Sequence, residues 1–224
     1  MNKKIGIMQG RLLPKYKGRY QAHPLGYWKE EFEIASKIGL DYIEFILDYN
    51  NSEENPLIAT GGFEEIQQAQ ESSGVKVSSI CADYFMEAPI HSANHSVVDK
   101  SLGVLYQLIK KASKLNITDI VIPCVDQSSL KNEIFLNNFI NNIKSVTKTA
   151  EDENVNICLE TDLAPLPFAN LIEKIGSNKV TVNYDIGNSA ANGYDPVEEF
   201  NAYGQKITDL HIKDRLLHGP PVIL

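Results

Sequence analysis

The sequence predicts an α/β fold whose parallel strands form a barrel of the (β/α)8 TIM-barrel type. Strand-like and helical segments alternate along the chain, which is typical of a parallel sheet with crossover helices. Three short apolar segments end in Glu160, Asp185 and His211, at intervals of 25 and 26 residues. One strand-helix-strand unit takes roughly 30 residues. The three segments are therefore expected to be neighbouring parallel strands.

The individual elements follow from apolar periodicity along the chain. Strands are expected at residues 3–8, 41–46, 75–81, 118–123, 155–160, 180–185 and 207–212. Helices are expected at residues 28–38, 63–73, 94–115 and 133–153. A further helix is expected to begin at Asp195, because a capping residue is followed there by Pro196 and then by Glu198.

The last three strands favour a barrel over an open sheet. Side chains alternate between the two faces of a strand. In these strands the face that holds Glu160, Asp185 or His211 is the more polar one. The apolar face carries Val155, Ile157 and Leu159, then Val180, Val182 and Tyr184, then Leu210 and Ile212. An apolar face can pack on helices, whereas a polar face suits the inside of a barrel.

The whole chain, residues 1–224, is expected to be one domain, because no low-complexity linker interrupts the alternation. A dinucleotide-binding sheet has little support, since GIMQGRLL at residues 6–13 is not a GxGxxG pattern. Complete barrels have eight strands and run to roughly 250 residues. We therefore expect a C-terminally incomplete barrel of about seven strands, without the eighth strand and the last helices.

Composition and charge argue against several classes of protein. The formal net charge is -8, and nucleic-acid partners normally select for basic surfaces. No apolar run is long enough to span a membrane, and residues 1–12 lack the apolar core of a secretory signal. The three cysteines lack metal-type spacing, so buried free thiols in a reducing cytoplasm are expected.

Glu160, Asp185 and His211 are candidate metal ligands. Barrel enzymes carry their chemistry at the carboxyl ends of the strands, where these residues are expected. Two carboxylates and an imidazole suit a divalent ion such as Mn²⁺, Mg²⁺, Zn²⁺ or Co²⁺. The alternative interpretation is three separate polar caps on strand ends, in which case buried carboxylates would need other partners.

Short motifs at most of the expected strands carry a family resemblance. They are GIMQGRL at the first strand, GLDYIEF at the second, ICADYF at the third, LETD at the fifth, NYDIGN at the sixth and DLHIKDR at the seventh. In this order the chain resembles the xylose isomerase-like barrel family of sugar and sugar-phosphate isomerases and epimerases. The resemblance covers nearly the whole chain, and the order and spacing of the motifs are more specific than any single one.

The resemblance implies a single divalent metal held by Glu160, Asp185, His211 and a Glu on an eighth strand, which would lie beyond the last residue of this sequence. It also implies that Glu160 belongs to a pair of glutamates that moves a proton between adjacent sugar carbons through an enediolate. The metal would hold two substrate oxygens. Many relatives carry a His where this chain has Asn188, a residue that can orient a substrate hydroxyl.

Other polar residues at the strand ends are candidates for binding a sugar or sugar phosphate. These candidates are Gln9, Arg11, Glu44, Asn188, Lys213 and Arg215. Glu44 either contacts substrate or pairs with a basic neighbour, and both interpretations stay open. Lys213 and Arg215 follow His211 closely and could hold a phosphate or a sugar oxygen, with solvated side chains as the alternative.

Three functional hypotheses follow. The leading one is a metal-dependent sugar or sugar-phosphate isomerase or epimerase. The alternative is a non-catalytic remnant barrel that binds a sugar, a metal or a partner chain. An abasic-site endonuclease is disfavoured by the acidic charge and by only five histidines. Unpaired edges on the first and seventh strands would promote association, so we expect a homo-oligomer or cover by residues 216–224.

Overall fold

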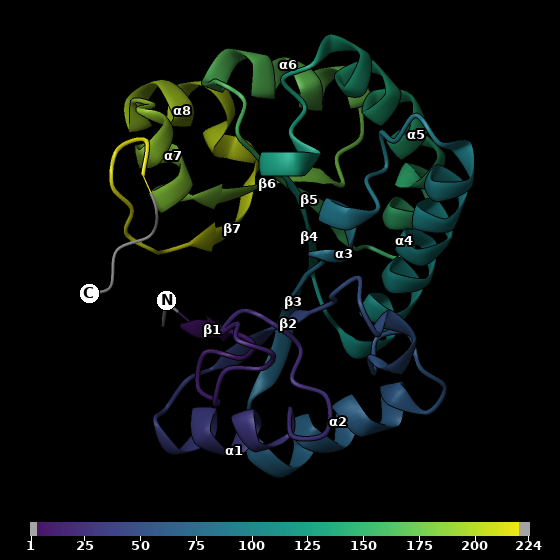
Figure 1. Ribbon diagram of the computed structural model, residues 1–224, viewed down its shortest axis with the longest axis vertical. Coiled ribbons are helices and arrows are strands. Elements are labelled where there is room, and N and C mark those ends of the chain that lie inside the picture. Colours follow the sequence, from purple (N-terminus) through teal and green to yellow (C-terminus); the bar gives the residue numbers. More distant parts are fainter. Residues whose placement is uncertain (1–3, 220–224) are drawn as a thin grey trace.

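The computed structural model describes residues 4–219 and has the predicted parallel α/β architecture. Seven strands lie side by side in chain order and curl into an open barrel (Figure 1). They are β1 (Gly6–Met8), β2 (Tyr42–Ile46), β3 (Lys76–Cys81), β4 (Asp119–Cys124), β5 (Asn156–Thr161), β6 (Val180–Asp185) and β7 (Ile207–His211). Each strand coincides with a predicted segment, and all but β1 agree within one residue at either end.

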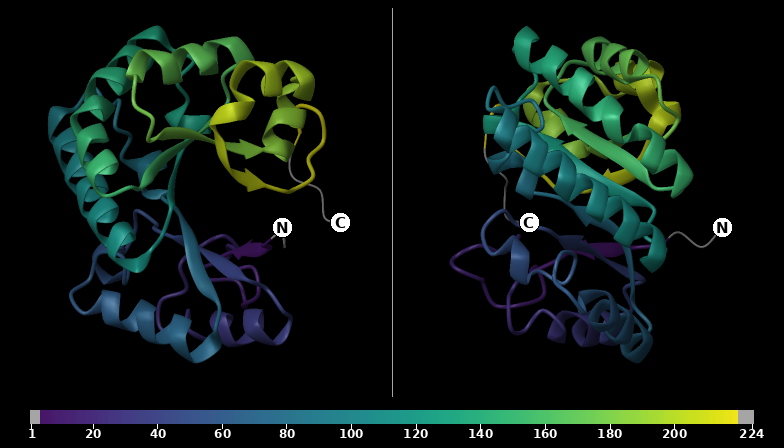
Figure 2. Two further views of the ribbon diagram at one scale, coloured as in Figure 1. Left: turned by 180° about the vertical axis from the view of Figure 1, so that it is seen from behind. Right: turned by 90° about the vertical axis from the view of Figure 1, so that its right-hand side faces the viewer.

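Helices surround the strands on the outside of the barrel, as Figure 2 shows from two further sides. They are α1 (Glu30–Lys37), α2 (Gly62–Ser73), α3 (Tyr84–Glu87), α4 (His95–Leu115), α5 (Glu133–Asp152), α6 (Pro165–Ile175), α7 (Ile186–Asn192) and α8 (Pro196–Tyr203). The predicted cap is confirmed, because Asp195 accepts hydrogen bonds from the backbone N–H groups of Val197 and Glu198 at 2.7 and 3.1 Å. Helices α3, α6 and α7 are not among the elements that the sequence predicts.

The apolar sides of the strands face the helices and form the core. Ile157, Leu159 and Val182 are fully buried, as the alternation on β5 and β6 predicts. The prediction is wrong for the last strand, because Leu210 in β7 and Ile212 just after it are 48% and 78% exposed. The cause is that the described residues after β7 include no helix that could cover its outer face.

The inside of the barrel carries polar side chains below the strand ends. The pairing of β6 with β7 shifts register between Val182 and Asn183, which leaves Thr208 as an extra residue of β7. The Thr208 hydroxyl donates to Asp119 at 2.6 Å and lies 2.8 Å from the hydroxyl of Thr181. These contacts join β4, β6 and β7 across the interior.

The barrel is open between its first and last strands. In residues 4–219, β1 pairs only with β2 and β7 only with β6, so each has an unpaired outer edge. The described part of the C-terminal tail lies against α7, where the backbone N–H of His218 donates to the carbonyl of Ala191 at 2.8 Å. Residues 216–219 therefore do not cover the open edges. Residues 220–224 lie outside the described part of the chain.

The cysteines match the expectation of buried free thiols. Cys81, Cys124 and Cys158 are all buried and unpaired. Burial raises the pKa of each thiol, which favours the unreactive protonated form. Among the described helices, none combines the length and the apolar character needed to cross a bilayer.

Buried carboxylates hold the long connection between β1 and α1. The backbone N–H groups of Gly10 and Leu12 donate to Glu31 at 2.7 and 3.0 Å. The backbone N–H of His23 donates to Asp48 at 2.8 Å. Gly10 has a φ of +87°, and a Cβ there would lie 2.2 Å from a backbone oxygen, so this turn requires glycine.

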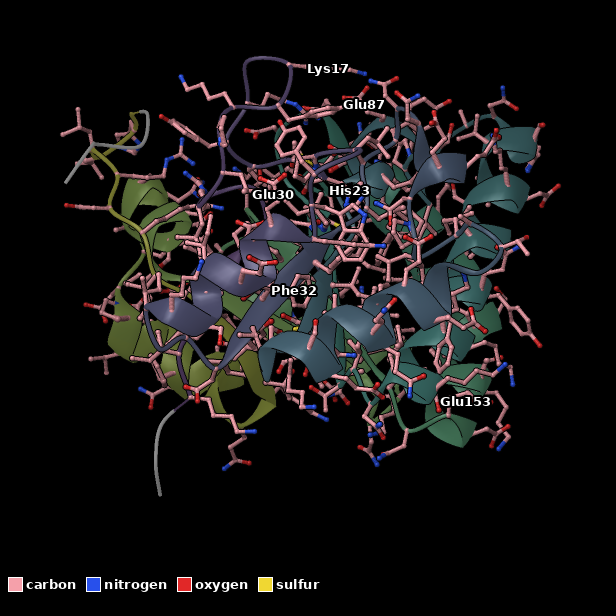
Figure 3. All side chains as sticks on the ribbon, turned by 90° about the horizontal axis from the view of Figure 1, so that it is seen from below. Lys17, His23, Glu30, Phe32, Glu87 and Glu153 are labelled. Carbon is pink, nitrogen blue, oxygen red and sulfur yellow. The ribbon has the colours of Figure 1, made fainter. Side chains whose placement is uncertain are left out.

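His23 lies inside the molecule, while Lys17 of the same connection points outward (Figure 3). Burial lowers the pKa of His23 from 6.5 to about 3. As the pH falls below 6.5, the unfolded chain takes up this proton first, so stability is lost. We expect the titration of His23 to lower the free energy of unfolding by about 2 kcal/mol when the pH falls from about 7 to about 5.

Denaturant titrations of the wild type and of His23→Gln at the two pH values measure this loss. The variant should lose less stability on acidification than the wild type, whatever its stability at neutral pH. Equal losses in the two proteins would show that His23 does not cause the pH dependence.

Candidate active site

The three candidate ligands meet at the carboxyl ends of adjacent strands. Glu160 lies near the end of β5, and Asp185 and His211 are the last residues of β6 and β7. His211 Nδ1 lies 3.6 Å from a carboxylate oxygen of Glu160 and 3.9 Å from one of Asp185. One ligand atom from each of the three residues falls within 4.8 Å of the others. The strands thus bring together the side chains that the sequence spacing places at neighbouring tips.

Asp185 has two roles that fix its carboxylate. Its Oδ1 caps α7 by accepting a hydrogen bond from the backbone N–H of Asn188 at 2.8 Å. Its Oδ2 faces His211 and is 2.5 Å from the ammonium of Lys213. Because the cap fixes one oxygen, the other is held at the mouth of the barrel.

Two amides hold the carboxylate of Glu160. The side-chain amides of Asn183 and Asn188 donate to its two oxygens at 3.0 and 2.5 Å. Arg215 in turn donates to Asn188 Oδ1 at 2.7 Å, and its guanidinium also donates to the carbonyl of Gly219. The segment after β7 therefore orients Asn188, which in turn orients Glu160.

His211 makes a contact through each ring nitrogen. Nδ1 lies 2.9 Å from the amide nitrogen of Asn183. Nε2 lies 2.7 Å from Oε2 of Glu44, which comes from β2 on the other side of the opening. Glu44, Asp209 and His211 form a second group with ligand atoms within 4.8 Å. The imidazole therefore stands between two sets of carboxylates.

The site concentrates negative charge in a buried place. Burial and, after it, the charge of Asp185 raise the pKa of Glu160 to about 7. Burial alone would lower the pKa of His211, but the carboxylates of Glu44 and Glu160 outweigh it and raise the pKa to about 10. Burial and the charge of Glu44 raise the pKa of Asp209 to about 6. A cation at this place would relieve the repulsion between the carboxylates.

The donor set fits a divalent metal ion. Glu160 and Asp185 are 7% and 4% exposed, and they offer oxygens toward the same imidazole nitrogen. Glu44 Oε1 is buried without a hydrogen-bond partner, and the contact of Asp185 Oδ2 with Lys213 lacks hydrogen-bond geometry. Carboxylates and imidazole are ligands of Mn²⁺ and Zn²⁺, and carboxylates of Mg²⁺.

The candidate substrate-binding residues differ in their surroundings. Arg11 is exposed and its guanidinium is 3.4 Å from Gln21. Gln9 is 0% exposed, and its Oε1 accepts from the backbone N–H of Ile46 at 3.0 Å and contacts His23 Nδ1 at 3.1 Å. Gln9 thus supports the connection after β1 from inside. Asn188, Glu44, Lys213 and Arg215 contact the candidate ligands or each other, as described above.

Asn183 and Asp209 belong to the site but are not among the predicted site residues. Each lies two positions before a predicted ligand on the same strand. The alternation of side chains could have found both, because residues two apart share a face.

The fold and this cluster define a class of protein, namely a barrel with two carboxylates and an imidazole on adjacent strand ends. A profile of the family described as xylose isomerase-like TIM barrel matches residues 32–220. The chain therefore belongs to the xylose isomerase-like TIM barrel family.

A relative from Haemophilus influenzae, provisionally named L-ribulose-5-phosphate 3-epimerase, is 26% identical over 196 residues, which are 84% of this chain and 68% of the relative. The 3-keto-D-glucoside 4-epimerase structure from E. coli has a TM-score of 0.71 at 14% identity, covering 96% of this chain and 80% of its own. D-psicose 3-epimerase from Clostridium cellulolyticum H10 has a TM-score of 0.73 at 16% identity, covering 93% and 72%. A family member from Mycobacterium smegmatis, in complex with magnesium, has a TM-score of 0.72 at 17% identity, covering 99% and 80%. At these identities the structures show the shared fold.

Proposed function

We propose that this protein is a metal-dependent sugar or sugar-phosphate isomerase or epimerase. The observation that carries the proposal is the meeting of Glu160, Asp185 and His211 at one mouth of the barrel. The names of the relatives support the same class, since one refers to a sugar-phosphate epimerase and two refer to epimerases of other sugars. The substrate is a small sugar or its phosphate.

Glu160, Asp185 and His211 are the proposed ligands of a divalent ion, with Mn²⁺, Mg²⁺, Zn²⁺ and Co²⁺ as candidates. When bound, such an ion supplies a Lewis acid that polarises sugar oxygens. The capping hydrogen bond on Asp185 and the amides on Glu160 hold both carboxylates in place before the ion arrives. Preorganised ligands of this kind need little rearrangement on binding.

Glu160 is also the proposed proton carrier. A carboxylate held at the mouth can remove the proton from the sugar carbon beside the carbonyl, and the transfer proceeds through an enediolate. Asn183 and Asn188 fix the direction of its two oxygens. Positioning of this kind matters because proton transfer requires hydrogen-bond reach between the base and the carbon acid.

The proposed contacts with substrate come from basic side chains. Arg11 is the exposed candidate for a phosphate or a sugar oxygen. Lys213 and Arg215 already contact Asp185 and Asn188, so a substrate at the mouth would meet groups that also orient the ligands. We further propose a cytoplasmic homo-oligomer, because free buried cysteines suit a reducing compartment and unpaired strand edges promote association.

Hydrogen exchange from a sugar carbon tests the proposed activity. The protein, stripped of metal and then loaded with Mn²⁺, is incubated in heavy water with a panel of ketoses and ketose phosphates. We expect solvent deuterium at the carbon beside the carbonyl of at least one sugar, detected by NMR, and no exchange in the metal-stripped protein. This readout needs one proton carrier only, so Glu160 suffices for it. A blank across the panel would favour a non-catalytic sugar- or metal-binding barrel.

A further inference from the structure

The imidazole of His211 is held by an ordered series of hydrogen bonds that crosses the barrel. The series begins at Glu160, passes through Asn183 and His211, and ends at Glu44. The successive donor–acceptor distances are 3.0, 2.9 and 2.7 Å. Its last contact joins residues that are 167 positions apart in the sequence.

The chemistry of the groups gives this series a direction. The side-chain NH₂ group of Asn183 donates to Oε2 of Glu160. The same nitrogen lies 2.9 Å from His211 Nδ1. A carboxylate oxygen accepts hydrogen bonds, so Nε2 of His211 carries a proton and donates it to Oε2 of Glu44 at 2.7 Å.

Glu44 is well suited to hold that proton. It is 5% exposed, and among the described side chains its carboxylate hydrogen-bonds only to His211. A buried carboxylate without this partner would be strongly unfavourable, so the ring and Glu44 stay together. The other ring nitrogen, Nδ1, lies 3.6 Å from a carboxylate oxygen of Glu160 and 3.9 Å from one of Asp185.

We propose that Glu44 is a positioning residue, which keeps the proton on Nε2 of His211 and thereby presents Nδ1 to the metal. The inference rests on the proposed function in that it takes Nδ1 as a ligand atom. Of the two open interpretations of Glu44, it selects pairing with a basic neighbour, which here is the candidate metal ligand His211. Carboxylate partners of this kind typically change metal affinity by about 10–100-fold when they are removed.

Calorimetric titration of the metal-free protein with Mn²⁺ tests the inference. We expect Glu44→Gln to bind Mn²⁺ about 10–100-fold more weakly than the wild type, with one ion per chain in both. Asp209→Asn is the matched control, because it removes a nearby negative charge without touching the hydrogen bond to His211. Equal weakening in both variants would mean that only the local charge matters, and the positioning role would be overturned.

A spectroscopic measurement identifies the nitrogen directly. In protein loaded with Zn²⁺ and labelled with ¹⁵N-histidine, the signal of His211 is assigned by its loss in His211→Asn. We expect Nε2 to carry a slowly exchanging proton in the wild type and a faster-exchanging one in Glu44→Gln. Metal bound to Nε2, or a second ion that disappears in Glu44→Gln, would overturn the inference.

These outcomes separate the inference from the function on which it rests. Wild-type protein that binds Mn²⁺ and exchanges sugar hydrogens, together with a Glu44→Gln variant of unchanged affinity, would leave the function standing and reject the positioning role. Wild-type protein that takes up no Mn²⁺ or Zn²⁺ would reject both. Circular dichroism and thermal unfolding of each variant confirm that the compared proteins are folded.

Discussion

Glu160→Gln is expected to slow the appearance of solvent deuterium in a ketose by about 10²–10⁴-fold. The amide has nearly the shape of the carboxylate and can still offer an oxygen to a metal, but it cannot accept the proton from a sugar carbon. Asn183 and Asn188 would still face it, so the local packing should survive. The rate of deuterium incorporation at saturating Mn²⁺, measured by NMR, checks the expectation.

The matched control is Glu173→Gln, which removes the same charge from an exposed position on α6. That variant should exchange at the wild-type rate. Metal content measured on the same samples separates the two roles of Glu160. Lost exchange with metal retained identifies a proton carrier, and loss of both identifies chiefly a ligand. Exchange at an unchanged rate in Glu160→Gln would contradict the proposed role.

Local patterns predict the strands well because side-chain alternation is a local property. Helix α6 is missed because Pro165 and Pro167 read as loop residues, although both fall in its first turn. At that position a missing N–H leaves no hydrogen bond unmade. Helix α7 has seven residues, too few for a clear periodicity, and it begins at the cap that Asp185 provides.

For the candidate site too, local patterns predict some residues, whereas other contacts depend on the tertiary structure. Glu160, Asp185 and His211 can be found from strand ends and spacing alone, because parallel strands bring their carboxyl ends to one edge. The partner of Glu44 could not be chosen, since its contact with His211 depends on how far the sheet curls. The surroundings of Gln9 also depend on tertiary structure, because the connection after β1 folds over it.

Another buried carboxylate, that of Glu199 on α8, contacts the helix-facing side of β6 and supports the site. Glu199 on α8 is 2% exposed and accepts hydrogen bonds from the hydroxyls of Tyr184 at 2.9 Å and Tyr203 at 2.6 Å, and also from that of Ser189. Tyr184 lies between Asn183 and Asp185 on the opposite face of the strand, and Ser189 follows Asn188 on α7. Glu199 therefore ties α7, α8 and β6 together.

Glu199→Ala is expected to lower the free energy of unfolding by about 3–5 kcal/mol, because it leaves buried hydroxyls without their acceptor and opens a cavity. Glu198→Ala, at the exposed neighbouring position, should change it by about 0.5 kcal/mol or less. Urea titrations of both variants give the comparison. Because Ser189 adjoins Asn188, a loosened α7 should also weaken the hold on Glu160, so Glu199→Ala should bind Mn²⁺ less tightly than Glu198→Ala even where both are fully folded. Similar stabilities for the two variants would show that the buried hydroxyl cluster does not anchor this side of the barrel.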